Sequence, residues 1–513
     1  MGRQDVSLEV EAKYDLDASV TPALDALPGS RTVTALEKAG TRRLSATYYD
    51  TPGLDLLRHG ITLRRRTGGT DAGWHLKLPA GTGRLEVHRP AGRSGAPVPA
   101  ELTALVRAVL RDRVPEPVVR LRTTRDVTRV LGRDGAVLAE VADDTVTAEA
   151  PGGRAESWRE VEVELVAGKP RLLATVGDLL RAQGATPSRY GSKLARALDG
   201  RVPAEPVPNA HRGPRRGAGA GDVVLGHLRA LRDELLACDP LVRLDAPDAV
   251  HRMRVATRRM RSALASFRPL FTPDSAVALR EELAWLAAVL GAARDAEVLR
   301  DLLGAQVEAL PADLRHGPVA ERIATQLEQA YHTAHEEAVA ELDGARYLTL
   351  LVAVDAFVAD PPFARPARRP ADRELPALLA RTVRRVTREL AAARAEPGLP
   401  ERELRSHEVR KAAKRARYTA EALSPLFGSP SRDVARRMRQ VQETLGSHQD
   451  SLLARDWLLA AASRAQAAGE PTFTYGFLHA RQWHGDGDTD ANLAAADALL
   501  PRSATRWPRT RRR

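Results

Sequence analysis

The hydrophobic period of the chain changes once, from two residues to three and four, and this change constrains the fold more than any other feature. Upstream, short runs bounded by turn-forming residues alternate polar and apolar positions, as in LEVEAK, WHLKL and REVEVEL. Downstream, apolar residues recur at helical spacing, as in DVVLGHLRALRDELLA. The stretch between them is rich in Pro and Gly and has no apolar periodicity, which is typical of a linker. The sequence therefore predicts an α+β protein with a β domain at 1–200, a linker at 201–220, a helical domain at 221–500 and a basic tail at 501–513.

The helical half contains an internal repeat. HRMRVATRRMR begins at His251 and HEVRKAAKRAR begins at His407, and both place basic residues three, seven and ten positions after the histidine. In each copy we expect the next helix to end in Leu-Gly, shortly before an aspartate, Asp295 or Asp450. Both landmarks recur in nearly the same register, so we predict two related helical bundles, at about 221–360 and 374–500, connected through the proline-rich segment 361–370.

The strands of the first half separate their charges by sign. Residues two apart in a strand share a face, so some strands present only carboxylates and others only cations. One interpretation is an antiparallel sheet whose charged face meets water. The other is a barrel with the charged face inward, and the segregation by sign favours it, because clustered carboxylates bind divalent cations and a wall of cations needs an anion. Such an interior suits a metal-bound phosphate chain.

An ordered series of motifs in this half resembles the CYTH domain, the family of triphosphate tunnel metalloenzymes. The series begins with ExExK at Glu9, Glu11 and Lys13 and continues with YYDT at 48–51, LRRR at 63–66, HLK at 75–77 and EVEVEL at 160–165. The resemblance implies an antiparallel eight-stranded tunnel that holds a triphosphate and requires Mg²⁺ or Mn²⁺. The family includes class IV adenylyl cyclases, thiamine triphosphatases and inorganic triphosphatases.

The same resemblance implies roles for individual residues. The implied metal ligands are Glu9, Glu11, Glu162 and Glu164, with Asp143 or Asp144 as a further ligand. The implied phosphate-binding residues are Lys13, Arg64, Arg66, Lys77, Arg122 and Lys193, with Arg84, Arg120, Arg125 and Glu160 as further candidates. The catalytic set expected from these roles is Glu9, Glu11, Lys13, Glu162 and Glu164.

The two histidine-led segments predict basic stripes on two helices. Positions i, i+3, i+7 and i+10 fall on one side of a helix, so each histidine aligns with three cations. One stripe is His251, Arg254, Arg258 and Arg261, and the other is His407, Arg410, Lys414 and Arg417. A solvated face is the alternative, but a merely solvated face has no reason to repeat its register. The arrangement resembles the CHAD domain, a helical family with conserved histidines, which implies that these eight residues bind inorganic polyphosphate.

The composition bounds the partners and the compartment. Lys and Arg exceed Asp and Glu by twelve, which favours an anionic partner. Nucleic acid is the rival ligand, but aromatic residues for base stacking are nearly absent from the basic helices, so no specific nucleic acid is expected. With Cys238 as the only cysteine, and neither a long apolar run nor a signal-like start, we expect a cytoplasmic protein without membrane contact, with polyphosphate granules as a further location. The sequence does not predict the oligomeric state.

The sequence thus predicts a metal-dependent triphosphatase that acts on tripolyphosphate and carries a polyphosphate-binding helical domain. No GxxxxGK[ST] loop is present, which argues against a P-loop NTPase. Two alternatives stay open: a noncatalytic polyphosphate-binding scaffold, and a nucleotide enzyme such as an adenylyl cyclase or a thiamine triphosphatase.

Overall fold

The structure is a computed structural model that divides the chain into two compact units, 1–207 and 208–513. It describes residues 6–17, 20, 22–28, 32–81, 83–93, 95–149, 155–199, 217–445, 447–485 and 489–500. The predicted linker, apart from 217–220, and the predicted tail lie outside the described residues.

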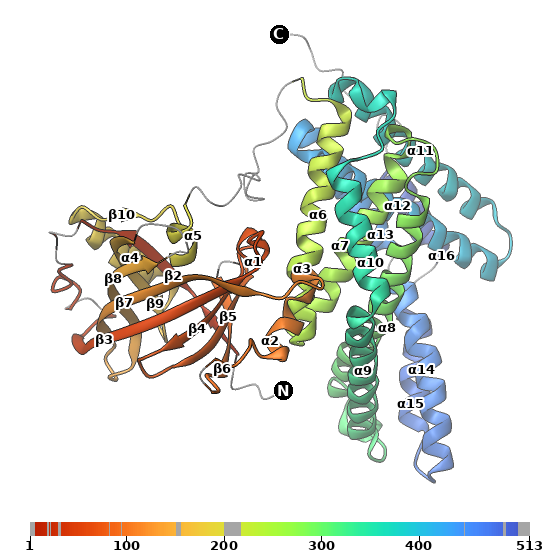
Figure 1. The fold of residues 1–513 in the computed structure, drawn as a ribbon. Coiled ribbons are helices and arrows are strands. Elements are labelled where there is room, and N and C mark those ends of the chain that lie inside the picture. The colour runs from red at the N-terminus through yellow and green to blue at the C-terminus, as the bar shows by residue number, and fades with distance from the viewer. Residues whose placement is uncertain are drawn as a thin grey trace. The chain divides into compact units, whose positions relative to one another are not determined.

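The first unit is one antiparallel sheet with short helices (Figure 1). Its strands are β1 (Val6–Glu9), β2 (Glu11–Asp15), β3 (Ala35–Asp50), β4 (Thr62–Thr67), β5 (Gly73–Ala80), β6 (Gly83–Pro90), β7 (Glu116–Leu131), β8 (Val137–Glu149), β9 (Glu156–Leu165) and β10 (Thr186–Pro187). Its helices are α1 (Asp55–Arg58), α2 (Ala100–Leu105), α3 (Arg107–Leu110), α4 (Pro170–Ala182) and α5 (Lys193–Ala197). The pairing order is β1-β6-β5-β4-β3-β7-β8-β9-β2-β10.

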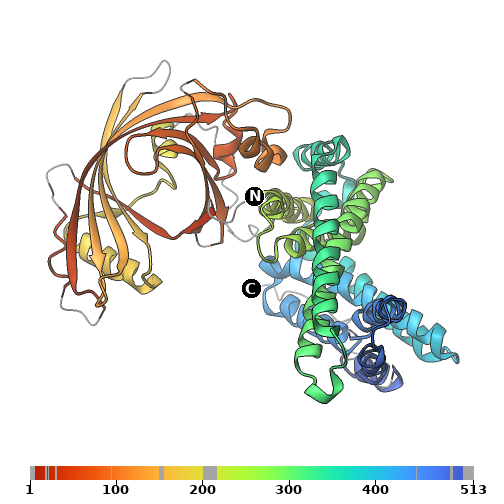
Figure 2. The ribbon, with the colours of Figure 1, turned by 90° about the horizontal axis from the view of Figure 1, so that it is seen from below.

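The predicted eight-stranded closed tunnel is wrong in strand number and in closure. Over the described residues the sheet has ten strands, and its pairing order has two ends, so hydrogen bonds do not close it into a ring. The segment 6–15, which reads as one strand in sequence, divides at Val10, because its first half pairs with β6 and its second half with β9. The tenth strand is the two-residue β10, for which the sequence gives no signal. The sheet nevertheless curves around an interior, as Figure 2 shows.

The two faces of the curved sheet bury different kinds of residue. On the outer face, Val161 and Val163 of β9 pack with Val176 and Leu180 of α4 in a buried apolar cluster. On the inner face of the same strand, the alternating positions are the glutamates at 160, 162 and 164. The strand alternation therefore sends apolar side chains outward beneath a helix and carboxylates into the interior.

One region of the interior is apolar. Tyr48 of β3, Leu121 of β7 and Val146 of β8 form a buried cluster with Leu194 of α5. Because α5 inserts Leu194 among these inward side chains, the charged part of the interior begins at Lys193, the residue before it.

The second unit is helical throughout its described residues. Its helices are α6 (Ala220–Arg243), α7 (Ala249–Ser266), α8 (Val277–Glu308), α9 (Val319–Asp343), α10 (Ala345–Ala359), α11 (Ala371–Ala395), α12 (Leu399–Phe427), α13 (Ser429–Thr444), α14 (Ser447–Ala467), α15 (Phe473–Gly485) and α16 (Thr489–Ala498). The proline-rich segment lies between α10 and α11. In the described part of the chain, no helix combines the length and the apolar character needed to cross a membrane.

The packing of the helices does not follow the two sequence halves. Helices α11, α12, α13 and α16 share one core around Val386 and Val409. Helices α14 and α15, which belong to the second repeat, pack with α8 and α9 of the first repeat around Leu303 and Leu458. The last part of the second repeat therefore completes the core of the first.

The two Leu-Gly landmarks adopt different structures. We expected a helix to end at each, but α8 continues through Leu290 and Gly291 to Glu308. A glycine weakens a helix by only about 1 kcal/mol, so packing along a helix of 32 residues retains it. Gly291 lies beside the guanidinium of Arg254, because a Cβ on this glycine would be 3.5 Å from it, an ordinary contact distance. In the second copy one helix ends at Thr444 and the next begins at Ser447.

Candidate functional site

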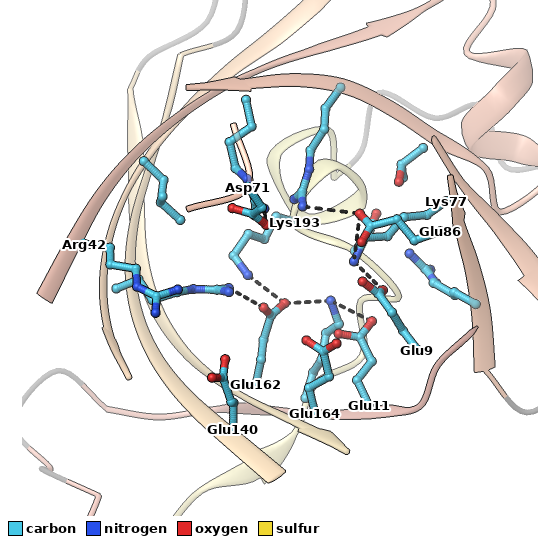
Figure 3. A pocket seen from close by; sticks show the side chains of 18 of the residues that line it. Glu9, Glu11, Arg42, Asp71, Lys77, Glu86, Glu140, Glu162, Glu164 and Lys193 are labelled. Carbon is cyan, nitrogen blue, oxygen red and sulfur yellow. Dashed lines mark hydrogen bonds and ion pairs between the residues drawn. The ribbon is translucent and has the colours of Figure 1, made fainter. Parts of the chain in front are cut away.

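The interior of the curved sheet holds a charged cavity of about 290 Å³ (Figure 3). Among the described residues, nine cationic and seven acidic side chains line it. They come from every strand of the sheet except β10, from the β4–β5 loop through Asp71 and from α5 through Lys193. Strand β8 contributes only Glu140. The side chain of Lys193 is 7% exposed, whereas that of Asp71 is 50% exposed, so the cavity opens toward the β4–β5 loop.

Strand register brings the ExExK motif and the glutamates of β9 together. Glu11 lies opposite Glu164, and Lys13 lies opposite Glu162 in the ladder between β2 and β9. Glu9, on β1, lies opposite Arg84 of β6. Side chains of directly paired residues on one face are neighbours, so these residues, far apart in the sequence, share one wall.

Glu162 is paired with three cations at close distance. It lies 2.7 Å from the ammonium of Lys13, 2.6 Å from the guanidinium of Arg125 and 2.6 Å from the ammonium of Lys193. Burial opposes the charge of Glu162, but Lys13 and the other two cations hold its pKa well below the usual range. Glu162 is therefore ionised and fixed in position by three cations.

A second carboxylate group lies beside it. Oxygen atoms of Asp144, Glu160 and Glu162 approach within 4.8 Å of one another, and among the described residues this is the one group with metal-ligand spacing. The ammonium of Lys193 lies 2.9 Å from Asp144 and 2.8 Å from Glu160, while Arg125 forms two hydrogen bonds with Asp144. Two cations of the cavity thus neutralise these two buried acids, which lie behind its lining.

Glu9 lies in a chain of polar contacts that connects strands β1, β5 and β6. Lys77 donates a hydrogen bond of 2.5 Å to Glu9, and its ammonium lies 3.8 Å from Glu86. The ring of His75 connects Glu86, 2.9 Å from Nδ1, with the backbone oxygen of Asp71, 2.9 Å from Nε2. Burial and the Glu86 carboxylate raise the pKa of Glu9 to about 8.

The donor set of this wall fits a hard divalent cation. Burial, together with Glu11 and Glu162, also raises the pKa of Glu164, and no ion pair with Glu164 forms among the described residues. The cross-strand pair of Glu11 and Glu164 places two like charges opposite each other, which is unfavourable without a cation. Carboxylate oxygens are the ligands that Mg²⁺ and Mn²⁺ prefer. Glu9, Glu11, Glu162 and Glu164 therefore have the ligand chemistry for such an ion, whereas among the described residues the carboxylates with metal-ligand spacing are Asp144, Glu160 and Glu162.

Three residues from the sequence analysis, Arg120, Arg122 and Asp143, face away from the cavity. Arg122 pairs with Glu149 at 2.9 Å, and its side chain is 64% exposed. The alternation in β7 was correct, but the apolar side, with Leu121, faces the interior, so Arg122 and Arg120 face away. Asp143 pairs with Arg159 at 2.6 Å, whereas its neighbour Asp144 points to the interior. Periodicity defines two faces but does not say which face is inside.

The cavity also contains residues that the sequence analysis did not single out. Tyr48 accepts a hydrogen bond of 3.3 Å from Arg64, and Glu86 shares a face with Arg84 on β6. The other unpredicted charged residues of the lining are Arg42, Asp71, Arg129 and Glu140. Glu86 was detectable from the alternation of RLEVH, whereas Asp71 lies in a loop that has no periodicity.

The β4–β5 loop contributes a carboxylate to the opening. Asp71 forms an ion pair with Arg66, and its backbone oxygen contacts His75. The loop approaches β3 closely: a Cβ on Gly68, at φ +82°, would lie 2.2 Å from the carbonyl oxygen of Arg43. The glycine therefore allows the turn that brings Asp71 to Arg66.

The helical unit brings its two basic stripes together. Helices α7 and α12 are in contact, and Arg254, Arg258 and Arg410 all act electrostatically on Lys414. Burial and these cations lower the pKa of Lys414 to about 7. The predicted stripes, one from each repeat, therefore form one cationic cluster.

The ends of the stripes are less highly charged. Arg254 pairs with Asp295 at 3.4 Å, and Arg417 pairs with Glu421 at 3.5 Å. The side chain of the corresponding Asp450 lies outside the described residues. Burial lowers the pKa of His251 and of His407, so both rings flank the cluster as neutral groups near pH 7.

Comparison with known proteins finds matches to both halves of the chain. The CYTH domain matches residues 7–197, and the CHAD domain matches residues 226–459. Both resemblances drawn from the motifs are thereby confirmed. Two uncharacterized proteins from two strains of Mycobacterium tuberculosis are 39% identical to this chain over 492 residues, which is 93% of this chain and 93% of each relative.

Solved structures resemble each half separately. The CHAD domain from the plant Ricinus communis is 24% identical, with a TM-score of 0.45, and the match covers 56% of this chain and 96% of that chain. PptA from Streptomyces chartreusis is 22% identical, with a TM-score of 0.41, over 55% of this chain and 98% of that chain. A candidate adenylate cyclase from Bacillus halodurans is 15% identical, with a TM-score of 0.26, over 38% of this chain and 98% of that chain.

Proposed function

The chain belongs to the family of proteins that join a CYTH domain to a CHAD domain, and on that premise we propose that it hydrolyses inorganic triphosphate and binds inorganic polyphosphate. The first unit would carry the hydrolytic site and the second the binding site. The proposed cofactor is Mg²⁺ or Mn²⁺. Inorganic tripolyphosphate is the proposed substrate.

One observation carries the proposal for the first unit: a single cavity has one wall rich in carboxylates and another rich in cations. Glu11, Glu162 and Glu164 lie on the paired strands β2 and β9, whereas Arg64, Arg66 and Lys77 lie on β4 and β5. A triphosphate bound with a divalent cation has the same division of charge, because the metal binds carboxylates and the phosphate oxygens bind Arg and Lys. Among the described residues of the lining, the aromatic and aliphatic side chains are Tyr48 and Leu44 alone, which offers little surface for a nucleoside.

The residues of the cavity would have three different roles. Glu9, Glu11, Glu162 and Glu164 would hold the metal, which when bound supplies charge neutralisation to the phosphates as a Lewis acid. Arg64, Arg66 and Lys77 would bind phosphate oxygens and orient the chain by charge-assisted hydrogen bonds. Lys13, Arg125 and Lys193 would keep Glu162 ionised and in place, which fixes the acidic wall before substrate arrives.

The test is phosphate release from tripolyphosphate, ATP and thiamine triphosphate, measured side by side with Mg²⁺, with Mn²⁺ and with EDTA. We expect release from tripolyphosphate that needs a divalent cation and exceeds release from the two other substrates. Cyclic AMP formed from ATP would instead identify a cyclase. Binding of tripolyphosphate without any release would identify a noncatalytic scaffold.

The helical unit supports the second half of the proposal through its cationic cluster. Arg258, Arg410 and Lys414 lie close enough to act on one another, and no ion pair to them forms among the described residues. Such mutual repulsion is relieved by an anion with many charges. The test is calorimetric titration of the full chain with long-chain polyphosphate in EDTA, in which Arg258→Gln combined with Lys414→Met should weaken binding.

A further inference from the structure

The basic cluster of the helical unit has three neighbouring regions, and they differ in how their cations are paired. In the first region, Arg254 forms an ion pair with Asp295. In the second region, Arg417 pairs with Glu421, which also contacts Arg259 at 3.1 Å. The third region lies between α7, α8 and α12, and most of its cations have no acidic partner among the described residues.

A cavity of about 400 Å³ occupies this third region. Its walls combine cations with small apolar side chains, and its one acidic residue, Glu281, is exposed. The lining residues important here are Arg258 and Arg261 from α7, Arg280 from α8, and Lys411, Lys414 and Arg415 from α12. Arg280 and Arg415 belong to neither repeated stripe.

Most of these cations have no acidic partner. Within the described residues, no ion pair forms with Arg258, Arg261, Arg280, Lys414 or Arg415, whereas Lys411 pairs with Glu408 at 2.9 Å. The side-chain oxygen of Ser262 and the Nε atom of Arg280 are buried without a hydrogen-bond partner. A wall of half-buried donors and cations without acceptors is a site that an anion completes.

The electrostatics support this conclusion independently of the pairing. Burial lowers the pKa of Arg415, and Arg385, Arg280 and Arg261 lower it further. Burial and Arg280 likewise lower the pKa of Arg261. The groups around the cavity therefore repel one another across three helices, and the fold retains this repulsion.

We propose that the cavity between α7, α8 and α12 is a phosphate-binding pocket, in which Arg280 and Arg415 bind phosphate groups of a chain that lies along the stripes. This rests on the proposed polyphosphate binding and deepens it by adding a site outside the repeated motif. A phosphate chain leaving the stripes toward Asp295 or Glu421 meets carboxylates, whereas the cavity continues the run of unpaired cations. The phosphate chain therefore turns into the cavity at Arg258 and Lys414, because these two residues belong both to the stripes and to the cavity lining.

The test compares three variants of the full chain by calorimetric titration with long-chain inorganic polyphosphate in EDTA. The cavity variant is Arg280→Gln with Arg415→Gln, and the stripe variant is Arg258→Gln with Lys414→Met. The control is Arg315→Gln, an exposed residue beyond the end of α8, about 40 Å along the helix axis from Arg280. Any contribution of the first unit is the same in all variants and cancels in the comparison.

We expect the cavity variant to weaken binding by on the order of tenfold or more, as loss of hydrogen bonds to a charged group does, and the control to change it little. The melting temperature without ligand should stay constant or rise in the cavity variant, because mutual repulsion is removed. A purely structural role would lower it. Partial recovery of affinity by Arg280→Lys with Arg415→Lys would support a role in charge recognition.

Two results would overturn the inference. If the stripe variant loses affinity while the cavity variant matches the control, the pocket is not used, and polyphosphate binding by the stripes stands. If neither variant loses affinity, the proposed polyphosphate binding fails together with the pocket.

Discussion

The ammonium of Lys193 lies 2.6 Å from the carboxylate of Glu162, at the inner end of the charged cavity. Glu162 was identified from sequence as a metal ligand, yet three cations of the chain already surround it. Its role in holding the wall together must therefore be separated experimentally from its role toward a metal.

Glu162→Gln should abolish hydrolysis and also destabilise the first unit. The substitution leaves Lys13, Arg125 and Lys193 without one shared counter-charge, and breaking a buried ion pair costs about 3–5 kcal/mol. Thermal unfolding followed by circular dichroism would measure the loss. An unchanged melting temperature would contradict the structural role assigned to Glu162.

Glu164→Gln is the cleaner test of the metal site. Glu164 has no ion pair among the described residues, and burial near Glu11 and Glu162 already raises its pKa. We expect a rate reduction on the order of 10²-fold or more with an unchanged or higher melting temperature. Phosphate release measured over a range of Mn²⁺ concentrations would check this, and wild-type turnover at all of them would refute the assignment. Glu11→Gln should behave similarly, although its contact with Lys13 at 3.2 Å is then lost.

Asp71→Asn should strengthen substrate binding. Asp71 pairs with Arg66, a cation expected to bind phosphate, so its carboxylate competes with the substrate at the opening. Because the side chain of Asp71 is half exposed, the expected decrease in KM for tripolyphosphate is about two- to fivefold, with little change in kcat.

The control for this prediction is Asp178→Asn, which removes an equal charge from the outer helix α4. It should leave KM unchanged. In an Arg66→Ala background, Asp71→Asn should lose its effect, as a double-mutant cycle would record. An increase of KM in Asp71→Asn would show that Asp71 assists substrate binding.

Polyphosphate binding by the helical unit should weaken as the pH rises above about 7. Burial and the cations Arg258, Arg410, Arg417 and Arg254 lower the pKa of Lys414 to about 7 in the free protein. A bound polyanion favours the protonated ammonium and raises this pKa. Between the pKa of Lys414 in the free protein and its higher pKa in the complex, binding takes up a proton. The affinity therefore falls by up to about tenfold per pH unit in this range, and it is constant below about pH 7. Titration of the full chain in EDTA at pH 6, 7, 8 and 9 would measure this.

The matched control is Lys414→Arg, because arginine stays charged throughout this pH range. The variant should bind with similar affinity and without the loss above pH 7. A wild-type affinity that is constant from pH 6 to 9 would contradict the role of Lys414. Without ligand, stability should increase from about pH 7 toward pH 10, because the unfolded chain holds this proton more tightly than the folded one.

The two units should cooperate on long chains through effective concentration. A chain held by the helical unit presents its end to the first unit at a raised local concentration, for which short flexible linkers give millimolar values. The stripe variant Arg258→Gln with Lys414→Met should therefore raise KM for long polyphosphate. KM for tripolyphosphate should stay constant, because a short chain does not occupy both sites. Equal changes for both substrates would mean that the units act independently.

The sequence predicted which segments form strands better than it predicted how these strands pair and which face of each lies inside. Period-two alternation identified the strands, and the sign of their charges identified the cavity wall, because both depend on local spacing. The split of segment 6–15 at Val10 was not predictable, because it depends on which strands lie on either side. The inward face of β7 was missed for the same reason, since Leu121 packs inside against α5 and Arg122 is left outside.

The candidate sites show a similar division. The repeat predicted the two basic stripes, but it did not predict Arg280 or Arg415, which reach the same cavity from positions outside the motif. Asp71 was missed because its position follows from the turn at Gly68 and from the reach of one loop. The packing of α14 and α15 against α8 and α9 of the first repeat was likewise not predicted, because similar helices can pack against either copy.

The cavity of the sheet and the cationic cluster of the helical unit differ in how their own cations are compensated. In the cavity of the sheet, carboxylates partner most of the described cations, so its attraction for an anion would depend on how much divalent cation is bound. In the cationic cluster, the central cations have no acidic partner among the described residues and repel one another. Monovalent salt alone would therefore screen their attraction for an anion. On the proposed function, one polypeptide would contain two anion sites that respond to different ions of their surroundings, the first to the divalent cation and the second to ionic strength.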